Sequence, residues 1–363
     1  NLLSQSANLG YVQALNDLGD LYFNGELAPK HMGKAYEYFL KASQNGSGYG
    51  SYSCGFILMK GSSDIPRDIE KGLSMFRLAV EQNYKAATRD LARYYYSLET
   101  EEDNRKALDY YLQYIEYNPK DTDTLLHIGL IYESGLGVPL NIDLARRYYE
   151  RAAEQDETGM AYNFLGGTYM NDEETESNER KAVHYFQKAI ELGNTNAMFR
   201  ISYYLHNGKG GLQVDIPREI ELLTEASKRG NHQATYRLGL LFEDNESGMA
   251  QNLELSVKYF QLAADNGILA AINKMGELYL FGEVIPANLT KAISCFMAAS
   301  EQGYGKASYW LGRLHTDGIG QLEKDTQKAM NYYRKAIEQG YEEAREWMEQ
   351  LQKNLVDETM TDI

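Results

Sequence analysis

A small residue recurs every 36 or 37 residues along this chain, and this period constrains the fold more than any other feature. A period in this range is typical of arrays in which one small helical unit stacks on the next. Such an array offers a long surface lined by side chains, but no single deep core to hold a catalytic cluster. The nine copies of the position are Gly19, Gly55, Ala92, Gly129, Gly166, Ser202, Gly239, Gly276 and Gly312.

The residues around this position predict the first helix of each copy. With the small residue as position zero, another small residue stands at −5, an apolar residue at −1 and usually an aromatic residue at +3. Around Gly276 these are Ala271, Met275 and Tyr279. The offsets lie on one face of an α-helix, with small residues where a partner helix must approach closely.

A second helix follows in each copy and is marked most clearly by a Lys-Ala pair such as Lys34-Ala35. Four residues after the alanine an aromatic residue recurs, with Leu223 as the exception. A glycine such as Gly46 or Gly340 then commonly follows, where it fits a left-handed helix C-cap before the next copy. The aromatic residues are Phe39, Phe76, Tyr111, Tyr149, Phe186, Phe260, Phe296 and Tyr333.

These patterns resemble the Sel1-like repeat, a relative of the tetratricopeptide repeat. The likeness is carried by A-x3-L-G-x2-Y-x2-G in the first helix and K-A-x2-Y-[FY]-x2-A-x3-G in the second. Gly135 to Pro139 and Gly318 to Gly320 reproduce the glycine-rich loop between the helices. The resemblance covers roughly residues 1 to 350 and implies an all-α fold, a right-handed superhelical α-solenoid of about nine helix-turn-helix repeats. Copies three, five and six depart from the motif.

The period also predicts the domain organisation, a single array over residues 11–343. Residues 1–10 are interpreted as the tail of a truncated repeat. Residues 344–356 are expected to form a capping helix, and residues 357–363 a tail. The predicted repeats are 11–46, 47–83, 84–118, 119–156, 157–193, 194–230, 231–267, 268–303 and 304–340.

Composition narrows the classes of partner. The formal net charge of −16 argues against a nucleic-acid binder, which normally carries a basic stripe, and against binding to anionic membranes. No apolar run approaches the roughly 20 residues needed to span a bilayer. Cys54 and Cys295 lie six repeats apart and are expected to be free thiols. This argues against an extracellular protein stapled by disulfides, and leaves the cytoplasm and the secretory lumen both open.

No motif for chemistry is present in the sequence. The six histidines are scattered, none with a second His or Cys at metal-ligand spacing. The phosphate-binding loop, the dinucleotide fingerprint and the nucleophile elbow are all missing. We predict that the chain is not an enzyme and uses no metal or cofactor.

The offsets −3, +1 and +4 of the first helix form a second stripe. By resemblance to tetratricopeptide arrays, this stripe lines the concave side of the superhelix. Large apolar residues and arginines at such positions are typical of interaction surfaces. The alternative is that superhelical curvature buries them between copies. The candidate binding residues are Tyr52, Phe56, Met59, Arg89, Arg93, Tyr96, Leu126, Leu130, Phe199, Tyr203, His206, Tyr236 and Leu240, and copy one has milder residues there, Asn16, Asp20 and Phe23.

The resulting hypothesis is a non-catalytic scaffold or adaptor, with a groove over copies two to seven that holds an extended segment or short helix of a partner protein. Arg89 and Arg93 would bind a carboxylate of that segment. The alternative for this pair is a solvated face, where they pair with Asp90 and nearby glutamates. Two other functions remain open, a regulatory or targeting domain of a larger enzyme and an envelope carbohydrate-binding module. The oligomeric state is also open.

Overall fold

The computed structural model describes residues 2–25, 29–244, 251–319 and 322–361, and within them the chain forms α-helices and no β-strand. The predicted all-α fold is therefore confirmed. The helices are α1 (Leu2–Asn8), α2 (Val12–Asn24), α3 (Met32–Gln44), α4 (Gly48–Lys60), α5 (Ile69–Glu81), α6 (Ala86–Tyr96), α7 (Glu101–Tyr117), α8 (Thr122–Ser134), α9 (Ile142–Ala153), α10 (Met160–Met170), α11 (Glu176–Glu191), α12 (Thr195–Asn207), α13 (Ile216–Lys228), α14 (His232–Glu243), α15 (Leu253–Asp265), α16 (Leu269–Phe281), α17 (Leu289–Glu301), α18 (Gly305–Asp317), α19 (Thr326–Glu338) and α20 (Ala344–Thr361).

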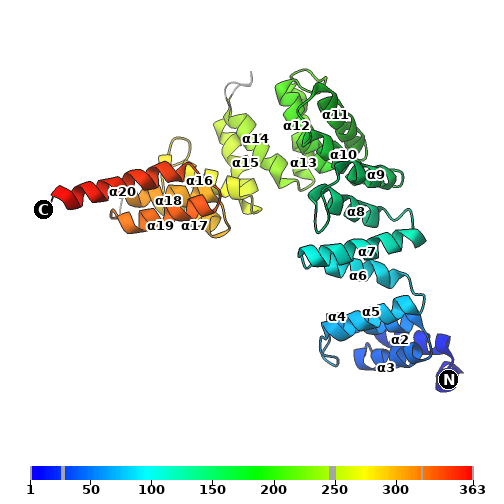
Figure 1. Cartoon of the computed structure of the whole chain (residues 1–363). Helices are drawn as coiled ribbons and strands as arrows, with labels where there is room; N and C mark the ends of the chain where they lie inside the picture. The colour runs from blue at the N-terminus through cyan, green and yellow to red at the C-terminus, as the bar shows by residue number, and fades with distance from the viewer. Residues whose placement is uncertain (1, 26–28, 245–250, 320–321, 362–363) are drawn as a thin grey trace. The chain divides into compact units, whose positions relative to one another are not determined.

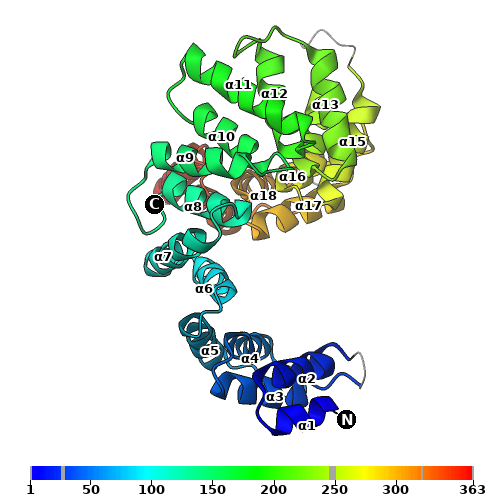
Figure 2. The same ribbon diagram turned by 90° about the vertical axis from the view of Figure 1, so that its right-hand side faces the viewer.

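The chain divides into two compact units, Asn1–Glu174 and Thr175–Ile363. In the N-terminal unit α2 lies beside α3, α4 beside α5, and α6 beside α7 (Figure 1). In the C-terminal unit α12 lies beside α13, and α16 beside α17 (Figure 2). Each unit is thus a stack of helix pairs. The division falls inside copy five, between α10 and α11, at the acidic loop of a copy that departs from the motif.

Packing inside each helix pair explains the small residue at position zero. The aromatic ring of the second helix lies directly against it. A Cβ atom built on Gly55 would lie 2.6 Å from the Phe76 ring, and one on Gly276 would lie 2.6 Å from the Phe296 ring. Both rings are buried, with 4% and 0% of their surface exposed. The period of 36 or 37 residues therefore marks the positions where an aromatic ring packs directly against a helix backbone.

A second set of ring contacts joins the two helices of a pair. The residue at +3 of the first helix stacks on the residue that precedes the buried ring of the second helix, with interplanar angles of 4° to 8°. These contacts account for many of the 30 tyrosines as packing residues. The stacked pairs are Tyr22–Tyr38, Tyr95–Tyr110, Tyr132–Tyr148, Phe242–Tyr259 and His315–Tyr332.

The start of the second helix is fixed by one residue that caps it and also closes the preceding loop. In copy eight, the Asn288 side chain accepts a hydrogen bond from the Lys291 N–H at 3.0 Å, as N-cap residues do. The Asn288 N–H in turn donates to the carbonyl of Tyr279, the +3 residue, at 2.8 Å. We call this second contact the loop-closing bond. It joins His31 to Tyr22, Asp68 to Leu58, Asn141 to Tyr132, Asp215 to Leu205, Asn252 to Phe242, Asn288 to Tyr279 and Asp325 to His315.

Copies three and five differ because they lack the glycine loop. Without it the second helix begins earlier, after the caps Thr100 and Thr175, and is longer: α7 has 17 residues and α11 has 16, against 13 in α17. Copy six departs from the motif in sequence, yet it keeps the loop-closing bond between Asp215 and Leu205.

One arrangement of two serines and a glutamine joins successive repeats near both ends of the array. Ser43 and Ser51 share a hydrogen bond of 2.6 Å, Ser51 donates to the Gln82 Oε1 atom at 2.5 Å, and the Gln82 Nε2 atom donates to the Ser43 carbonyl at 2.9 Å. The same arrangement joins Ser300, Ser308 and Gln339, at 2.7, 2.5 and 2.8 Å. These bonds satisfy polar groups that would otherwise be buried without partners between repeats.

The C-terminal helix corrects one predicted boundary. Ala344 is buried and Trp347 packs near Tyr309, so α20 covers the last repeat as a capping helix would. However, α20 continues to Thr361, past the predicted end at residue 356. No glycine or proline stands between Ala344 and Thr361 to end it.

The two cysteines are free, as expected from the sequence. Cys54 is fully buried in the core beside Phe39, and burial raises the pKa of its thiol to about 12. Cys295 is partly buried, and burial also raises the pKa of its thiol. Both side chains act as packing residues.

Candidate partner-binding surface

In the N-terminal unit, the candidate stripe borders a hollow between the first helices of copies one and two. Tyr52 and Phe56 project from α4, and Phe56 is 40% exposed. Together with residues of α2 and α3 they enclose a cavity of about 210 Å³. We call it the aromatic pocket, and its lining residues are Asp20, Phe23, Phe39, Tyr49, Tyr52, Ser53 and Phe56.

The walls of the aromatic pocket are fixed by contacts between rings. Phe23 and Phe56 meet edge to face, with centroids 6.1 Å apart. Tyr52 stacks on Phe76 at 5.4 Å and contacts Tyr84 at 4.9 Å. Burial, followed by the charge of Asp90, raises the pKa of the Tyr52 phenol, so this side chain stays neutral. The hollow is therefore preformed by side chains that are already packed.

One charged group lines the aromatic pocket. The Tyr49 hydroxyl donates a hydrogen bond of 2.6 Å to the Asp20 Oδ1 atom. Burial and this contact with Asp20 raise the pKa of Tyr49 to about 12. Within residues 2–25, 29–244, 251–319 and 322–361, Asp20 has no ion-pair partner. The Asp20 Oδ2 atom thus remains available beside a wall of rings.

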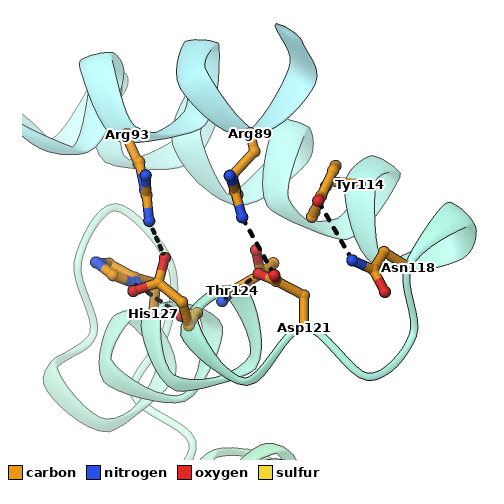
Figure 3. A network of polar contacts seen from close by, with 8 residues as sticks. Arg89, Arg93, Tyr114, Asn118, Asp121, Thr124 and His127 are labelled. Atoms are coloured by element: carbon orange, nitrogen blue, oxygen red, sulfur yellow. Dashed lines mark hydrogen bonds and ion pairs between the residues drawn. The ribbon is translucent and has the colours of Figure 1, made fainter. Parts of the chain in front are cut away.

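Arg89 and Arg93 bind carboxylates of the next repeat (Figure 3). Both side chains point from α6 toward the start of α8. The Arg89 Nη1 atom lies 3.2 Å from the Asp121 Oδ1 atom, and the Arg93 Nη2 atom lies 2.6 Å from the Asp123 Oδ2 atom. The alternative from the sequence named Asp90 and nearby glutamates as partners, whereas the ion pairs found in the described residues join the two arginines to aspartates of copy four.

The Arg89 contact is the more enclosed of the two. Asp121 is also the N-cap of α8, where its Oδ2 atom accepts from the Thr124 N–H at 3.0 Å. The Arg89 guanidinium lies 5.5 Å from the centre of the Tyr114 ring. Side-chain exposure is 31% for Arg89 and 14% for Asp121, whereas Arg93 and Asp123 are 45% and 44% exposed. Figure 3 shows this network joining two repeats.

The other candidate binding residues of this unit are buried to different degrees. Leu126 is only 6% exposed, so the expectation of an exposed side chain is wrong there. Tyr96 meets the edge of His127 at 5.2 Å, and Met59 and Leu130 are partly buried.

In the C-terminal unit, Tyr203 is the most exposed member of the stripe, at 42%. The Lys209 ammonium lies over its ring at 5.6 Å. His206 is not free, because its Nδ1 atom lies 3.0 Å from the Oε2 atom of Glu219. Glu219 is fully buried and also binds Arg237 at 3.1 Å. Phe199 is partly buried.

Tyr236 and Leu240 pack against the core around Phe260. The Tyr236 and Phe260 rings lie 5.6 Å apart, and burial raises the pKa of Tyr236 to about 12. They therefore contribute to the interior of copy seven. Among the candidates, exposed rings occur at offset +1, in Phe56 and Tyr203.

Five of the residues that line the pocket are not among the candidates predicted from the sequence: Asp20, Phe23, Phe39, Tyr49 and Ser53. Asp20 and Phe23 occupy offsets +1 and +4 of copy one, so both belong to the stripe. Their residue types did not by themselves indicate a binding site. Tyr49 stands at offset −6, outside the stripe. It lines the pocket because copies one and two stack. Offsets along a single helix do not predict contacts between copies.

Among the residues that the structure describes, no three His, Cys, Asp or Glu side chains gather closely enough to hold a metal ion. None of the helices in that part of the chain has the length and apolar character to cross a membrane.

Curated relatives match only part of the chain. The Sel1-repeat-containing protein YjcO of Escherichia coli K12 is 31% identical over 78 residues, which cover 21% of this chain and 34% of that protein. Protein sel-1 homolog 2 of Rattus norvegicus is 40% identical over 70 residues, which cover 19% of this chain and 10% of that protein. The matched part thus spans about a third or less of these relatives.

Solved structures match nearly the whole chain. A protective antigen of uropathogenic Escherichia coli with the Sel1-like repeat fold has a TM-score of 0.55 and 21% identity, covering 97% of this chain and 82% of that one. A Sel1 repeat protein from Oxalobacter formigenes has a TM-score of 0.54 and 21% identity, covering 96% and 89%. At this identity the likeness concerns the fold, an α-solenoid.

The Sel1 repeat family model matches nine segments, which confirms the predicted count of about nine repeats. They are residues 12–47, 49–84, 85–113, 124–157, 159–194, 195–231, 232–268, 269–304 and 305–341. Proteins built from such repeats are generally non-catalytic scaffolds for protein interactions. Because the matches extend from residue 12 to residue 341, this chain belongs to the Sel1 repeat family.

Proposed function

We propose that this chain is a non-catalytic scaffold that binds an extended segment or short helix of a partner protein along the first-helix stripe, with the aromatic pocket as its main anchor point. The observation that carries this proposal is Phe56, a large apolar side chain that is 40% exposed at the edge of a 210 Å³ hollow. Exposed aromatic side chains next to a hollow are typical of the centres of protein interfaces.

The rigidity of the pocket supports the proposal. Binding costs free energy when side chains must be ordered, about 0.5–1.5 kcal/mol for each flexible one. Tyr52 is already held by Phe76 and Tyr84, and Phe23 already contacts Phe56. A partner side chain that enters the pocket therefore has to order few additional side chains of this protein.

Position +1 of copy six supports a second contact in the C-terminal unit. Tyr203 is exposed there to the same extent as Phe56 in copy two. We assign it a subsidiary role, because Tyr203 does not line the aromatic pocket.

The test is selection of binding peptides from a random library displayed on phage, followed by affinity measurements with the full chain. We expect Phe56→Ala to weaken a selected peptide at least tenfold, which corresponds to about 1.4 kcal/mol. Tyr117→Ala is the matched control, since Tyr117 is an equally exposed ring, at 45%, at the end of α7 and off the stripe.

Circular dichroism would first establish that both variants fold. Peptides that bind Phe56→Ala and wild type equally well would contradict the assignment of the pocket as the anchor. Failure to select any peptide would contradict the binding of short segments.

A further inference from the structure

We propose that the aromatic pocket binds a cationic side chain, a lysine or arginine of the partner segment. This inference rests on the proposed function and adds the chemistry of the anchor residue. The carrying observation is the juxtaposition of Phe23, Tyr52 and Phe56 with Asp20 around one hollow, where the Asp20 carboxylate has no ion-pair partner among the described residues.

The size of the pocket fits a single side chain. Sites for whole small molecules usually measure about 300–1,000 Å³. The aromatic pocket, at about 210 Å³, is smaller than this range. It opens on the stripe where Phe56 is exposed, so a segment lying along the stripe can insert one residue into it.

The rings provide the first source of attraction. The faces of aromatic rings are electron-rich and attract cations that lie within about 6 Å of the ring centre. The chain itself already shows this on its stripe. Lys30 lies over the Phe23 ring at 5.5 Å, and Lys209 lies over the Tyr203 ring at 5.6 Å.

Asp20 provides the second source of attraction. The Tyr49 hydroxyl occupies its Oδ1 atom and orients the carboxylate, which leaves Oδ2 for a ligand. Asp121 and Asp123, by contrast, are each neutralised by an arginine of the preceding repeat. A cation that enters the pocket would gain a charge-assisted hydrogen bond, which is about twice as strong as a neutral one. An apolar side chain would leave the Asp20 Oδ2 atom without a cation.

The net charge of the chain agrees with a basic partner. A protein of formal charge −16 attracts cationic segments over several ångströms and speeds their encounter at low salt. An acidic partner segment would meet repulsion at the same surface.

The experiment compares peptides selected on the wild-type chain with versions in which one anchor residue is replaced. We expect selection to enrich lysine or arginine at one fixed position. Replacing that residue with norleucine, which has a similar length and no charge, is expected to weaken binding to wild type at least tenfold. In Asp20→Asn this difference between the charged and the norleucine peptide should shrink to less than threefold.

Asp17→Asn is the matched control. Asp17 lies one helical turn before Asp20 on α2, and the Gln13 side chain donates to it at 2.8 Å. This variant removes the same charge without touching the pocket, so it should keep the preference for the charged peptide. The Asn side chain in Asp20→Asn can still accept the Tyr49 hydrogen bond, and circular dichroism checks that it folds.

The outcomes separate the two proposals. If norleucine peptides bind as well as charged ones while Phe56→Ala still abolishes binding, the cationic anchor is wrong and the proposed function stands. If binding does not depend on Phe56 at all, both fail. If Asp17→Asn and Asp20→Asn reduce the preference for the charged peptide equally, then only the net charge of the chain matters. That result would also overturn the pocket as a cation site.

Discussion

At the scale of single residues, the small size of the residue at position zero allows the two helices of a repeat to pack closely. Gly55 and Gly276 leave room for the rings of Phe76 and Phe296, and a methyl group at either glycine would lie at a distance that real Cβ atoms essentially never show. Glycine lowers helix stability by about 1 kcal/mol relative to alanine. Its recurrence inside a helix therefore reflects packing rather than helix propensity.

We predict that Gly55→Ala lowers the free energy of unfolding of the N-terminal unit by about 1–3 kcal/mol, because the Phe76 ring must leave its position. Urea denaturation followed by circular dichroism measures the change. Gly33→Ala is the control: Gly33 is also helical, but its nearest neighbour would be the exposed His31 side chain at 3.3 Å rather than a buried ring. Gly33→Ala should be neutral or stabilising, and equal losses in both variants would contradict the packing argument.

His315 is expected to make the stability of the C-terminal unit depend on pH. Its ring stacks on Tyr332 at 5.6 Å, and its Nδ1 atom is buried with no hydrogen-bond partner among the described residues. Burial first, and then the charge of Lys328, lower the pKa of His315. The unfolded chain therefore binds a proton more readily than the folded one, and stability falls as pH drops from the ordinary histidine pKa of about 6.5 through the lowered value.

We accordingly predict that His315→Phe loses less stability than wild type between about pH 7 and pH 5. Phenylalanine keeps the stack on Tyr332, as Phe242 does on Tyr259 in copy seven, but it cannot be protonated. Thermal unfolding at a series of pH values gives the two slopes. Identical slopes would show that His315 does not contribute to the acid response.

At the scale of helices, contacts between repeats decide which stripe residues are free. The offsets in the sequence predicted the helix pairs well, because they depend on the geometry of one helix. They did not predict the partners of Arg89 and Arg93, since Asp121 and Asp123 belong to the following copy. The aromatic pocket was missed in part for the same reason: Tyr49 reaches it only through the stacking of copies one and two.

We predict that Arg89→Gln destabilises the N-terminal unit by about 1–2 kcal/mol, since it leaves the half-enclosed Asp121 without its cation. Arg93→Gln should cost at most about 1 kcal/mol, because that pair is more exposed to solvent. Urea denaturation at low and high salt distinguishes them, with the Arg93 effect fading in salt. Unchanged stability in both variants, together with lost peptide binding, would favour the original hypothesis that the two arginines bind a partner carboxylate.

At the scale of the whole molecule, each repeat contacts mainly its neighbours, so damage to one repeat should remain local. We predict that Gly55→Ala increases hydrogen exchange in α2 to α7 and leaves α16 to α19 at the wild-type level. Hydrogen–deuterium exchange with mass spectrometry measures both regions in the same sample. A comparable increase in α16 to α19 would instead indicate that the chain unfolds as one cooperative body.

The loop-closing bond has a consequence for how this protein can change. In copy two it spans Leu58 to Asp68, in copy four Tyr132 to Asn141, and in copy eight Tyr279 to Asn288, at 2.8 to 2.9 Å in each case. The stretches of chain that it closes differ in length and sequence, while the two atoms that meet stay the same. Because each stretch holds eight or nine residues between its two anchors, we expect a one-residue change in loop length to leave the stacking of the helices unchanged.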